Sequence, residues 1–184
     1  LAAVCDTDSE LLNEIAKEYP NLKCTEKLEN ILKNPEIDGV IVSTPSHTHY
    51  SIAKKLLLAG KNVYVGKPLA TSALEASELN ELALQKGLVL MVGHLLLYHP
   101  AVNRLKSMIK ENALGEITYA QSDRLNINYF RNDRSVMWDL APHDISMISY
   151  VTNLKPQKVT SAVGYASNDD GIIDVVHIDI AYEN

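Results

Sequence analysis

The sequence predicts an α/β domain with a doubly wound parallel sheet, followed by an α+β domain with an open, mainly antiparallel sheet. Two observations support this prediction. Up to about residue 93, short apolar strands alternate with amphipathic helices, and parallel strands need such crossover connections. Beyond about residue 96, longer segments alternate polar and apolar residues, as antiparallel strands with one face in water do. We therefore expect one domain over residues 1–95 and a second over residues 96–184.

The elements of the first part are defined by apolar spacing and by residues that begin or end a helix. Apolar residues recur at helical spacing from Leu11 to Tyr19, until Pro20. Gly60 and Gly87 end two later helices, and a capping box at Ser72 opens the second of these. The predicted order contains four strands: strand 1–5, helix 11–19, helix 28–32, strand 39–43, helix 52–59, strand 63–65, helix 73–86 and strand 88–92.

The second part is predicted to open with a helix over about residues 100–110. Gly115 then leads into an alternation of polar and apolar residues over 117–127, which predicts a strand. Two further strands are expected over 158–166 and 173–182, and they are typical of an antiparallel pair.

Composition and charge exclude several classes of protein. Among the 184 residues, 46% are hydrophobic and 22% charged, which is typical of a soluble globular protein. No apolar run approaches the roughly 20 residues that cross a bilayer, so we expect no membrane role. The formal charge of −6 comes without a basic stripe, so nucleic acid is not an expected partner.

The cysteines and the first residue suggest the setting of the chain. Cys5 and Cys24 are too few for a zinc site or a disulfide framework, and they favour a reducing cytoplasm. The sequence begins with Leu1, inside a predicted strand and without a targeting segment. We therefore expect the chain to lack its natural start.

Candidate site residues follow the predicted strands, because ligands of parallel sheets bind beyond the carboxyl ends of the strands. An acid at the end of the second strand of a dinucleotide fold binds ribose hydroxyls and repels a 2′-phosphate, so Asp6 favours NAD over NADP. A turn or N-cap role is the alternative for Asp6. The glycine-rich phosphate loop belongs roughly 20 residues earlier, outside the sequence. The residues that follow the strands are Asp6, Ser43, Thr44, Pro45, Gly66, Lys67, Pro68, Gly93 and His94.

Lys67 is the candidate that polarises a substrate hydroxyl. Pro68 holds the preceding residue extended, so that its ammonium can point toward a ligand. An exposed turn lysine is the alternative. His47 and His49 form a His-x-His pair, but no third ligand lies at a recognisable spacing, so no metal site is expected. Both imidazoles are expected at the start of a helix, near a cofactor or solvent.

Asp139 and His143 form the candidate acid and base pair. If the run from Trp138 is helical, these residues project from one face and can act on one small molecule. The alternative is that Asp139 caps the helix and His143 is a hydrogen-bonded, partly buried imidazole. Upstream, guanidinium groups at Arg124 and Arg131 suit a diphosphate or a sugar carboxylate. Pairing of these arginines with nearby aspartates, Asp123 and Asp133, is the alternative.

Four motifs together resemble the Gfo/Idh/MocA family of NAD(P)-dependent sugar oxidoreductases, in order and in spacing. They are Ser43-Thr44-Pro45 with His49, Gly66-Lys67-Pro68, Gly93-His94 and Asp139-x-x-x-His143. The resemblance covers nearly the whole chain. It implies a partial Rossmann domain without its first βα unit, then an α+β domain without its C-terminal end. It also implies a homo-oligomer in which the sheet of the second domain packs against a partner subunit.

The resemblance also implies roles for individual residues. Lys67 matches the lysine of the Glu-Lys-Pro motif of the family, and Asp139 and His143 match its acid and its proton-transferring histidine. Gly66 departs from the pattern, since the family has glutamate there. The expected substrate-binding residues are Lys67, Arg124, Asn126, Arg131, Asp139 and His143. The expected cofactor-binding residues are Asp6, Ser43, Thr44, Pro45, His49, Gly66, Lys67, Pro68, Gly93, His94 and Trp138.

We therefore expect an NAD-dependent dehydrogenase that moves hydride between a ring hydroxyl of a sugar and the cofactor. The segments 93–102 and 138–145 look most like family members acting on nucleotide sugars. His143 is expected to take the hydroxyl proton, Lys67 to polarise the oxygen, and Asp139 to orient the sugar or the imidazole. Two alternatives are a catalytically inactive NAD(P)-binding regulatory protein and a reductase of a small non-sugar carbonyl or imine.

Overall fold

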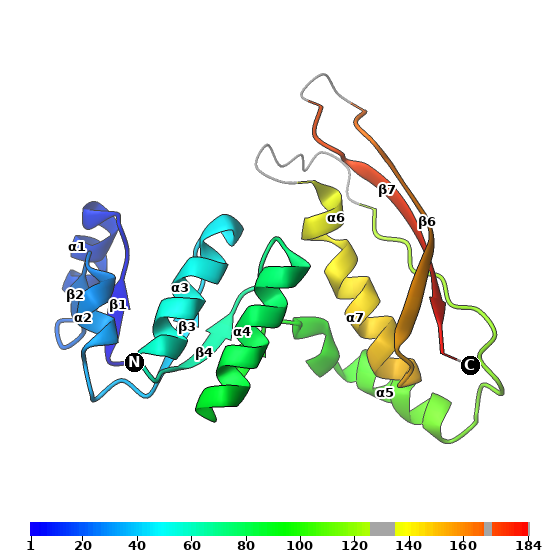
Figure 1. The fold of residues 1–184 in the computed structure, drawn as a ribbon, viewed down its shortest axis with the longest axis horizontal. Helices are drawn as coiled ribbons and strands as arrows, with labels where there is room; N and C mark the ends of the chain where they lie inside the picture. Colours follow the sequence, from blue (N-terminus) through cyan, green and yellow to red (C-terminus); the bar gives the residue numbers. More distant parts are fainter. Residues whose placement is uncertain (126–134, 168–170, 184) are drawn as a thin grey trace. The chain divides into compact units, whose positions relative to one another are not determined.

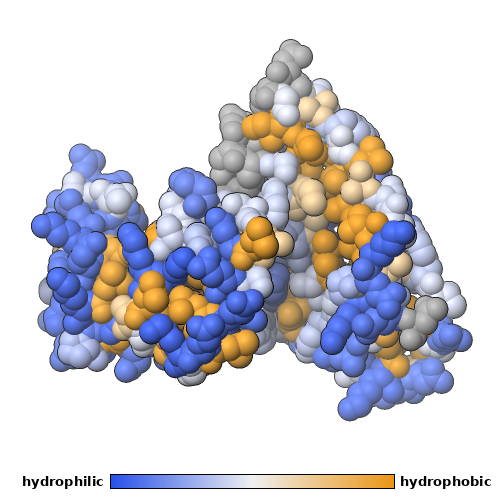
Figure 2. Space-filling view, viewed as in Figure 1, coloured by the Kyte–Doolittle hydropathy of each residue, from blue (hydrophilic) through white to orange (hydrophobic). Residues whose placement is uncertain are grey.

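The computed structural model describes residues 1–125, 135–167 and 171–183. Asn126, Arg131 and Asp133, to which the sequence analysis gives roles, lie outside these residues. The chain divides into two compact units, Leu1–Val92 and Gly93–Asn184 (Figure 1). Both units expose some apolar side chains in the view of Figure 2.

The first unit alternates short strands with helices, as predicted. One strand was missed, because the three residues of β2 are too few and too polar for a periodic signal. In chain order the elements are β1 (Ala3–Cys5), α1 (Ser9–Glu18), β2 (Lys23–Thr25), α2 (Leu28–Leu32), β3 (Gly39–Val42), α3 (Ser46–Leu58), β4 (Asn62–Val65), α4 (Ala73–Lys86) and β5 (Leu90–Val92).

All strand pairs of the first unit are parallel, which confirms the predicted α/β class. β1 pairs with β2, and β3, β4 and β5 form a second sheet in that order. In the register of β3 and β4, Val42 lies opposite Val65. These two strands therefore end at the same edge of the sheet, and the loops that follow them start side by side.

Two helices end at the predicted glycines, and α4 begins directly after Ser72, as predicted. Gly60 and Gly87 adopt positive φ, 78° and 64°, a conformation that glycine tolerates because it has no Cβ. Ser72 is the N-cap residue of α4, although its side chain makes no capping hydrogen bond. At another helix, α1, a side-chain cap is present: Asp8 accepts hydrogen bonds from the N–H groups of Glu10 and Leu11 at 2.9 and 3.0 Å.

The core of the first unit lies between the β3–β5 sheet and helices α3 and α4. Leu56, Leu57 and Leu79 are fully buried, with Val63 and Val65 beneath them. At the amino end of β4, Lys61 is only 6% exposed. Its Nζ donates to the carbonyl oxygens of Asn34 and Ile37 at 2.6 and 2.8 Å, so the buried ammonium is hydrogen-bonded.

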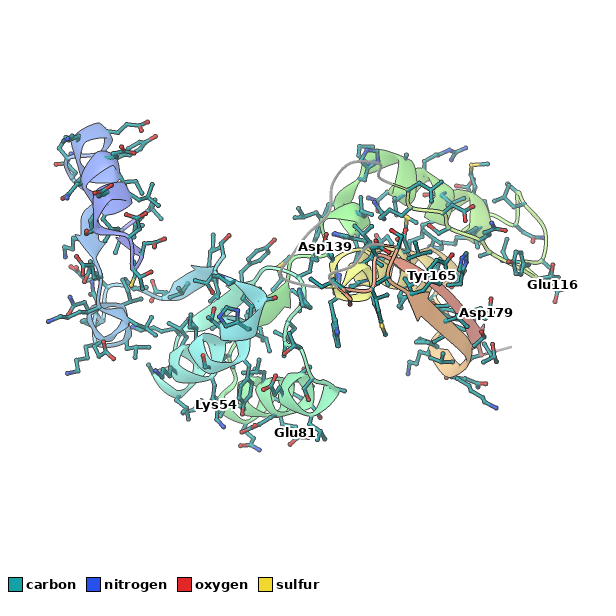
Figure 3. The ribbon with its side chains drawn as sticks, turned by 90° about the horizontal axis from the view of Figure 1, so that it is seen from above. Lys54, Glu81, Glu116, Asp139, Tyr165 and Asp179 are labelled. Carbon is teal, nitrogen blue, oxygen red and sulfur yellow. The ribbon has the colours of Figure 1, made fainter. Side chains whose placement is uncertain are left out.

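Helices α3 and α4 are also joined by a polar cluster on their outer side. Lys54 Nζ lies 2.5 Å from Glu78 Oε1, and the hydroxyl of Tyr50 donates to the same carboxylate. Figure 3 shows Lys54 and Glu81 on these two helices. Because the groups are substantially exposed, they fix the pairing of the helices more than they add stability.

The second unit begins with the 3₁₀ helix η1 (Leu95–Tyr98) and α5 (Pro100–Lys110), as the sequence predicts for 100–110. It continues with α6 (Val136–Asp139), α7 (Ala141–Thr152), β6 (Pro156–Tyr165) and β7 (Val175–Tyr182). β6 and β7 pair antiparallel, which confirms the predicted α+β character. Tyr150 of α7 donates to Asn103 Oδ1 of α5 at 2.8 Å, and this bond joins the two helices.

The strand predicted over 117–127 is wrong for its described part, 117–125, which has no strand structure. Alternation predicts which side chains share a face, but a strand also needs a neighbour for its backbone hydrogen bonds. Within the described residues, the backbone of 117–125 has no such neighbour.

Candidate functional site

The loops after β3 and β4 form the candidate site of the first unit. Ser43, Thr44 and Pro45 are exposed and lead directly into α3. Gly66, Lys67 and Pro68 follow β4, the parallel neighbour of β3. The hydroxyls of Thr44 and Thr48 are hydrogen-bonded at 2.7 Å, and that of Thr48 also lies 2.7 Å from the carbonyl of Pro45.

His49 links these two loops. Its ring is 3% exposed, so the imidazole belongs to the interior rather than to solvent. Nδ1 lies 2.7 Å from the carbonyl oxygen of Pro68, and Nε2 lies 2.8 Å from the carbonyl oxygen of Thr44. Both ring nitrogens are therefore used by the backbone, which differs from the ligand contact expected from the sequence. His47, two residues earlier, is exposed.

Lys67 lies in the turn between the half-buried Gly66 and the buried Pro68. The Lys67–Pro68 peptide bond is cis. The side chain of Lys67 is half-buried rather than fully exposed, and it makes interactions within the protein. A Cβ at Gly66 would lie 3.6 Å from the carbonyl oxygen of Val42 and 3.7 Å from Cε1 of His49, which are ordinary contacts. The backbone at residue 66 therefore has room for the Cβ of a larger side chain.

Asp6 and His94 follow β1 and β5, as predicted. Asp6 Oδ1 accepts from the N–H of Asp8 at 3.0 Å, so its carboxylate takes part in the turn before α1. Gly93 is buried and His94 half-buried. Burial lowers the pKa of His94, and its Nδ1 has no hydrogen-bond partner among the described residues.

Asp139 and His143 do not lie in one uninterrupted helix, which is the condition for the common helical face predicted from the sequence. Asp139 ends α6, Leu140 interrupts the helix, and His143 lies in the first turn of α7. Pro142 explains the break, because it lacks an N–H and its ring would meet the carbonyl of the residue four positions earlier. The residue at the N-cap position of α7 is Leu140 rather than Asp139. Both side chains are half-buried and make interactions.

Arg124 is bound by Asp144, a residue to which the sequence analysis gave no role. Nε of Arg124 donates to Oδ2 at 2.9 Å and Nη2 to Oδ1 at 3.0 Å, while Ser122 donates to Oδ1 at 2.7 Å. Burial tends to raise the pKa of Asp144, but the hydrogen bonds from Arg124 and Ser122 outweigh it and the pKa lies below its usual value. A separation of 20 residues gives no sequence signal for this pair.

Trp138, expected near the cofactor, lies in α6 and is 39% exposed.

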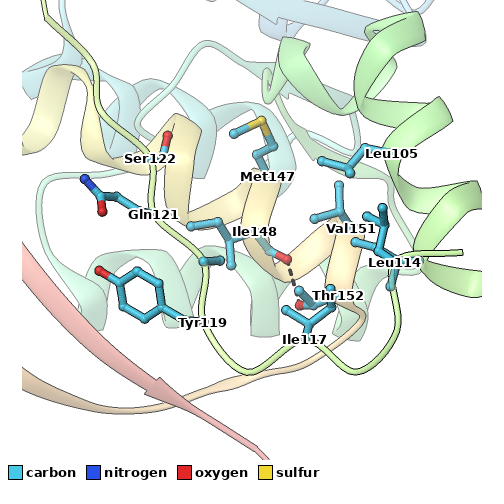
Figure 4. Close-up of a pocket in the computed structure, with 12 residues that line it drawn as sticks. Leu105, Leu114, Ile117, Tyr119, Gln121, Ser122, Met147, Ile148, Val151 and Thr152 are labelled. Carbon is cyan, nitrogen blue, oxygen red and sulfur yellow. Dashed lines mark hydrogen bonds between the residues drawn. The ribbon is translucent and has the colours of Figure 1, made fainter. Parts of the chain in front are cut away.

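A separate hollow in the second unit lies between α5, α7 and the segment 114–122 (Figure 4). Its lining is largely apolar, with Leu105, Met147 and Val151 on the helices, and it carries no Asp, Glu, Lys, Arg or His. This hollow therefore offers hydroxyl and amide groups but no charged or imidazole side chain.

Over the described parts of the chain, no group of three or more His, Cys, Asp or Glu side chains is arranged to hold a metal ion. Within the same residues, every helix is too short or too polar to span a membrane.

Comparison with known proteins establishes the family. Residues 1–94 match the model described as "Oxidoreductase family, NAD-binding Rossmann fold", and residues 102–184 match the Gfo/Idh/MocA C-terminal domain. The chain belongs to the Gfo/Idh/MocA family. Its fold is thus a Rossmann-like parallel sheet followed by the C-terminal domain of this family of oxidoreductases.

Individual Gfo/Idh/MocA relatives cover most of the chain. UDP-N-acetylglucosamine 3-dehydrogenase of Acidithiobacillus ferrooxidans is 32% identical over 92% of this chain and 52% of its own length. The scyllo-inositol 2-dehydrogenase (NADP(+)) of Bacillus subtilis is 28% identical over 92% of this chain and 49% of its own. The solved structure of Bacillus subtilis yvaA matches with a TM-score of 0.83 and 25% identity, over 99% of this chain and 53% of that one. The chain thus spans about half the length of the relatives that it matches.

Proposed function

We propose that the protein is an NAD-dependent dehydrogenase that oxidises a ring hydroxyl of a sugar, and that the sugar is nucleotide-linked. The single observation that supports this most is the 32% identity, over 92% of the chain, to a UDP-N-acetylglucosamine 3-dehydrogenase. A relative that acts on scyllo-inositol supports the broader class of cyclic polyols. The relatives include an NADP-dependent enzyme, and Asp6 is the residue that favours NAD here.

The residues after β3 and β4 fit a nicotinamide dinucleotide. Ser43 and Thr44 are exposed at the carboxyl edge of the sheet, directly before the 13-residue helix α3. The first N–H groups of a helix point outward and carry partial positive charge, so they suit a polar or anionic ligand. The bound nucleotide would supply the hydride acceptor.

The side chains of this chain supply the proton chemistry. We propose that His143 removes the proton of the substrate hydroxyl and that Lys67 polarises the same oxygen. Asp139 then orients the sugar or the imidazole. Removal of one proton-transfer group costs a factor of about 10² to 10⁴ in rate. Arg124 is held by Asp144. We therefore propose that Arg124 contributes to substrate binding indirectly, by fixing the position of segment 122–124.

The experiment measures reduced nicotinamide by absorbance with the full-length protein, NAD or NADP, and a panel of UDP-sugars and inositols. We expect turnover with a UDP-sugar and NAD, and losses in kcat of about 100-fold or more in Lys67→Ala and in His143→Ala. The exposed Lys55 and His177 provide matched controls, Lys55→Ala and His177→Ala, which should retain turnover. Unchanged kcat in both Lys67→Ala and His143→Ala would remove the assigned roles. Nucleotide binding by calorimetry without turnover on any substrate would instead support a regulatory protein.

A further inference from the structure

His49 is a buried polar side chain to which neither the sequence nor the proposed chemistry gives a catalytic role. It projects from the first turn of α3 and contacts the loop after β3 on one side and the turn after β4 on the other. The two contacts, 2.8 Å to Thr44 and 2.7 Å to Pro68, are both to backbone carbonyl oxygens.

The chemistry of these two contacts constrains the ring. A carbonyl oxygen accepts hydrogen bonds and does not donate them, so each ring nitrogen must donate if both contacts are hydrogen bonds. Neutral imidazole has one N–H and would bring a nitrogen lone pair against the other carbonyl. Imidazolium has two N–H groups, and charge-assisted N–H to oxygen bonds are typically about 2.7 to 2.9 Å long. Both observed distances match this range.

The two segments that contact the His49 ring offer it backbone carbonyl oxygens and no carboxylate. The segments 43–48 and 66–72, which contain the two carbonyls, have no Asp or Glu. Their charged or titratable side chains are Lys67 and the exposed His47. On α3 itself Tyr50 donates to Glu78 of α4, so this tyrosine and this acid are engaged with each other.

We propose that His49 is a positioning residue that uses both ring N–H groups to lock the loop after β3 to the turn that carries Lys67. Pro68 directly follows Lys67, so the bond to its carbonyl fixes the backbone path at the lysine. The bond to Thr44 fixes the other loop at the same edge of the sheet. The effect on catalysis rests on the proposed function, in which Lys67 acts on the substrate. An error of about 1 Å in the position of such a group can cost about 100-fold in rate.

Two isosteric variants separate the two hydrogen bonds. The amide nitrogen of asparagine takes the place of Nδ1, so His49→Asn keeps a donor toward Pro68. The amide nitrogen of glutamine takes the place of Nε2, so His49→Gln keeps a donor toward Thr44. We expect His49→Gln to lower kcat by about 10- to 100-fold and His49→Asn by less, with little change in the KM for the nucleotide. His47→Gln, at an exposed histidine of the same helix, is the matched control.

A double variant tests whether His49 acts through Lys67. In a Lys67→Ala background, His49→Gln should cause little further loss of kcat, because the group that it positions is already absent. Equal losses in the Asn and Gln variants would overturn the proposal. So would full additivity with Lys67→Ala, or a loss confined to the KM for the nucleotide.

A spectroscopic measurement tests the two hydrogen bonds of His49 and does not depend on enzymatic activity. In full-length protein labelled with ¹⁵N-histidine, both ring nitrogens of His49 should give resonances of the protonated type and should show coupling to a bonded proton. A pyridine-type resonance from either nitrogen would overturn the proposal even if the enzyme is active. If no substrate turns over, the proposed function fails, and this measurement still decides whether His49 holds the two loops.

Discussion

Arg124 and Asp144 form a two-point ion pair within the second unit. Nε and Nη2 of the guanidinium lie 2.9 and 3.0 Å from the two carboxylate oxygens, a geometry that lysine cannot reproduce. The side chains are 35% and 15% exposed, so the pair is partly shielded from solvent. Because Asp144 directly follows His143, the pair ties segment 122–124 to the turn of α7 that carries the proposed base.

Loss of this ion pair should destabilise the second unit. We expect Asp144→Asn to lower the free energy of unfolding by about 1 to 2 kcal/mol, because hydrogen bonds to a charged group are replaced by weaker ones. Urea denaturation of the protein measures this. Glu116→Gln is the matched control at an exposed acid and should change stability by less than about 0.5 kcal/mol. Equal stability of both variants would show that the pair contributes nothing.

The half-buried His94 should make stability depend on pH. Its folded pKa lies below the ordinary 6.5, because burial disfavours the charged ring. As pH falls through 6.5, the unfolded chain therefore takes up a proton that the folded chain does not, and stability decreases until the folded pKa is reached. We expect His94→Gln to lose this part of the pH dependence. Titration of the ring by NMR gives the midpoint, and a midpoint at or above 6.5 would contradict the expectation.

Two leucines near the end of α3 should differ sharply in their contribution to stability. Leu56 is fully buried whereas Leu58 is 55% exposed. Leu56→Ala removes packed side-chain volume and should cost about 2 to 5 kcal/mol of unfolding free energy. Leu58→Ala should cost less than about 1 kcal/mol, because this side chain already meets water. Similar losses in thermal or urea unfolding would indicate that α3 does not pack against the sheet as described.

Gly66 and Gly60 give a paired test of backbone conformation. Gly66 does not have a positive φ, and a Cβ there makes ordinary contacts, so Gly66→Ala should be neutral or stabilise by up to about 1 kcal/mol. Gly60 has φ of 78° with open space around it, so Gly60→Ala should cost about 1 to 2 kcal/mol through strain alone. Gly66→Glu, which restores the family residue, should fold like Gly66→Ala. Calorimetric melting of the three variants checks these signs.

Much of the fold is predictable where a local signal decides the structure. Helix α5 and the ends of α3 and α4 follow from apolar spacing and from Gly60 and Gly87. The rest depends on partners far along the chain. β2 is too short for a periodic pattern, and segment 117–125 has the pattern without a neighbouring strand.

The candidate site shows the same division. Lys67 and the residues after β3 are found from their place after a strand, because parallel strands end at one edge. Pro142 is the local signal in the sequence for the helix break between Asp139 and His143. The burial of His49 and the Arg124–Asp144 pair required coordinates, since Pro68 lies 19 residues from His49 and Asp144 lies 20 residues from Arg124.

Lys61 gives the first unit a built-in chemical reporter. Its ammonium is enclosed and bound to the carbonyl oxygens of Asn34 and Ile37, whereas Lys55 on α3 lies open to water. An acylating reagent should therefore label Lys55 within the native protein and reach Lys61 only when the unit opens. The ratio of modified Lys61 to modified Lys55, measured by mass spectrometry, therefore reports how often the structure opens near the start of β4. The same measurement can be made on any variant, including one in a mixture of proteins.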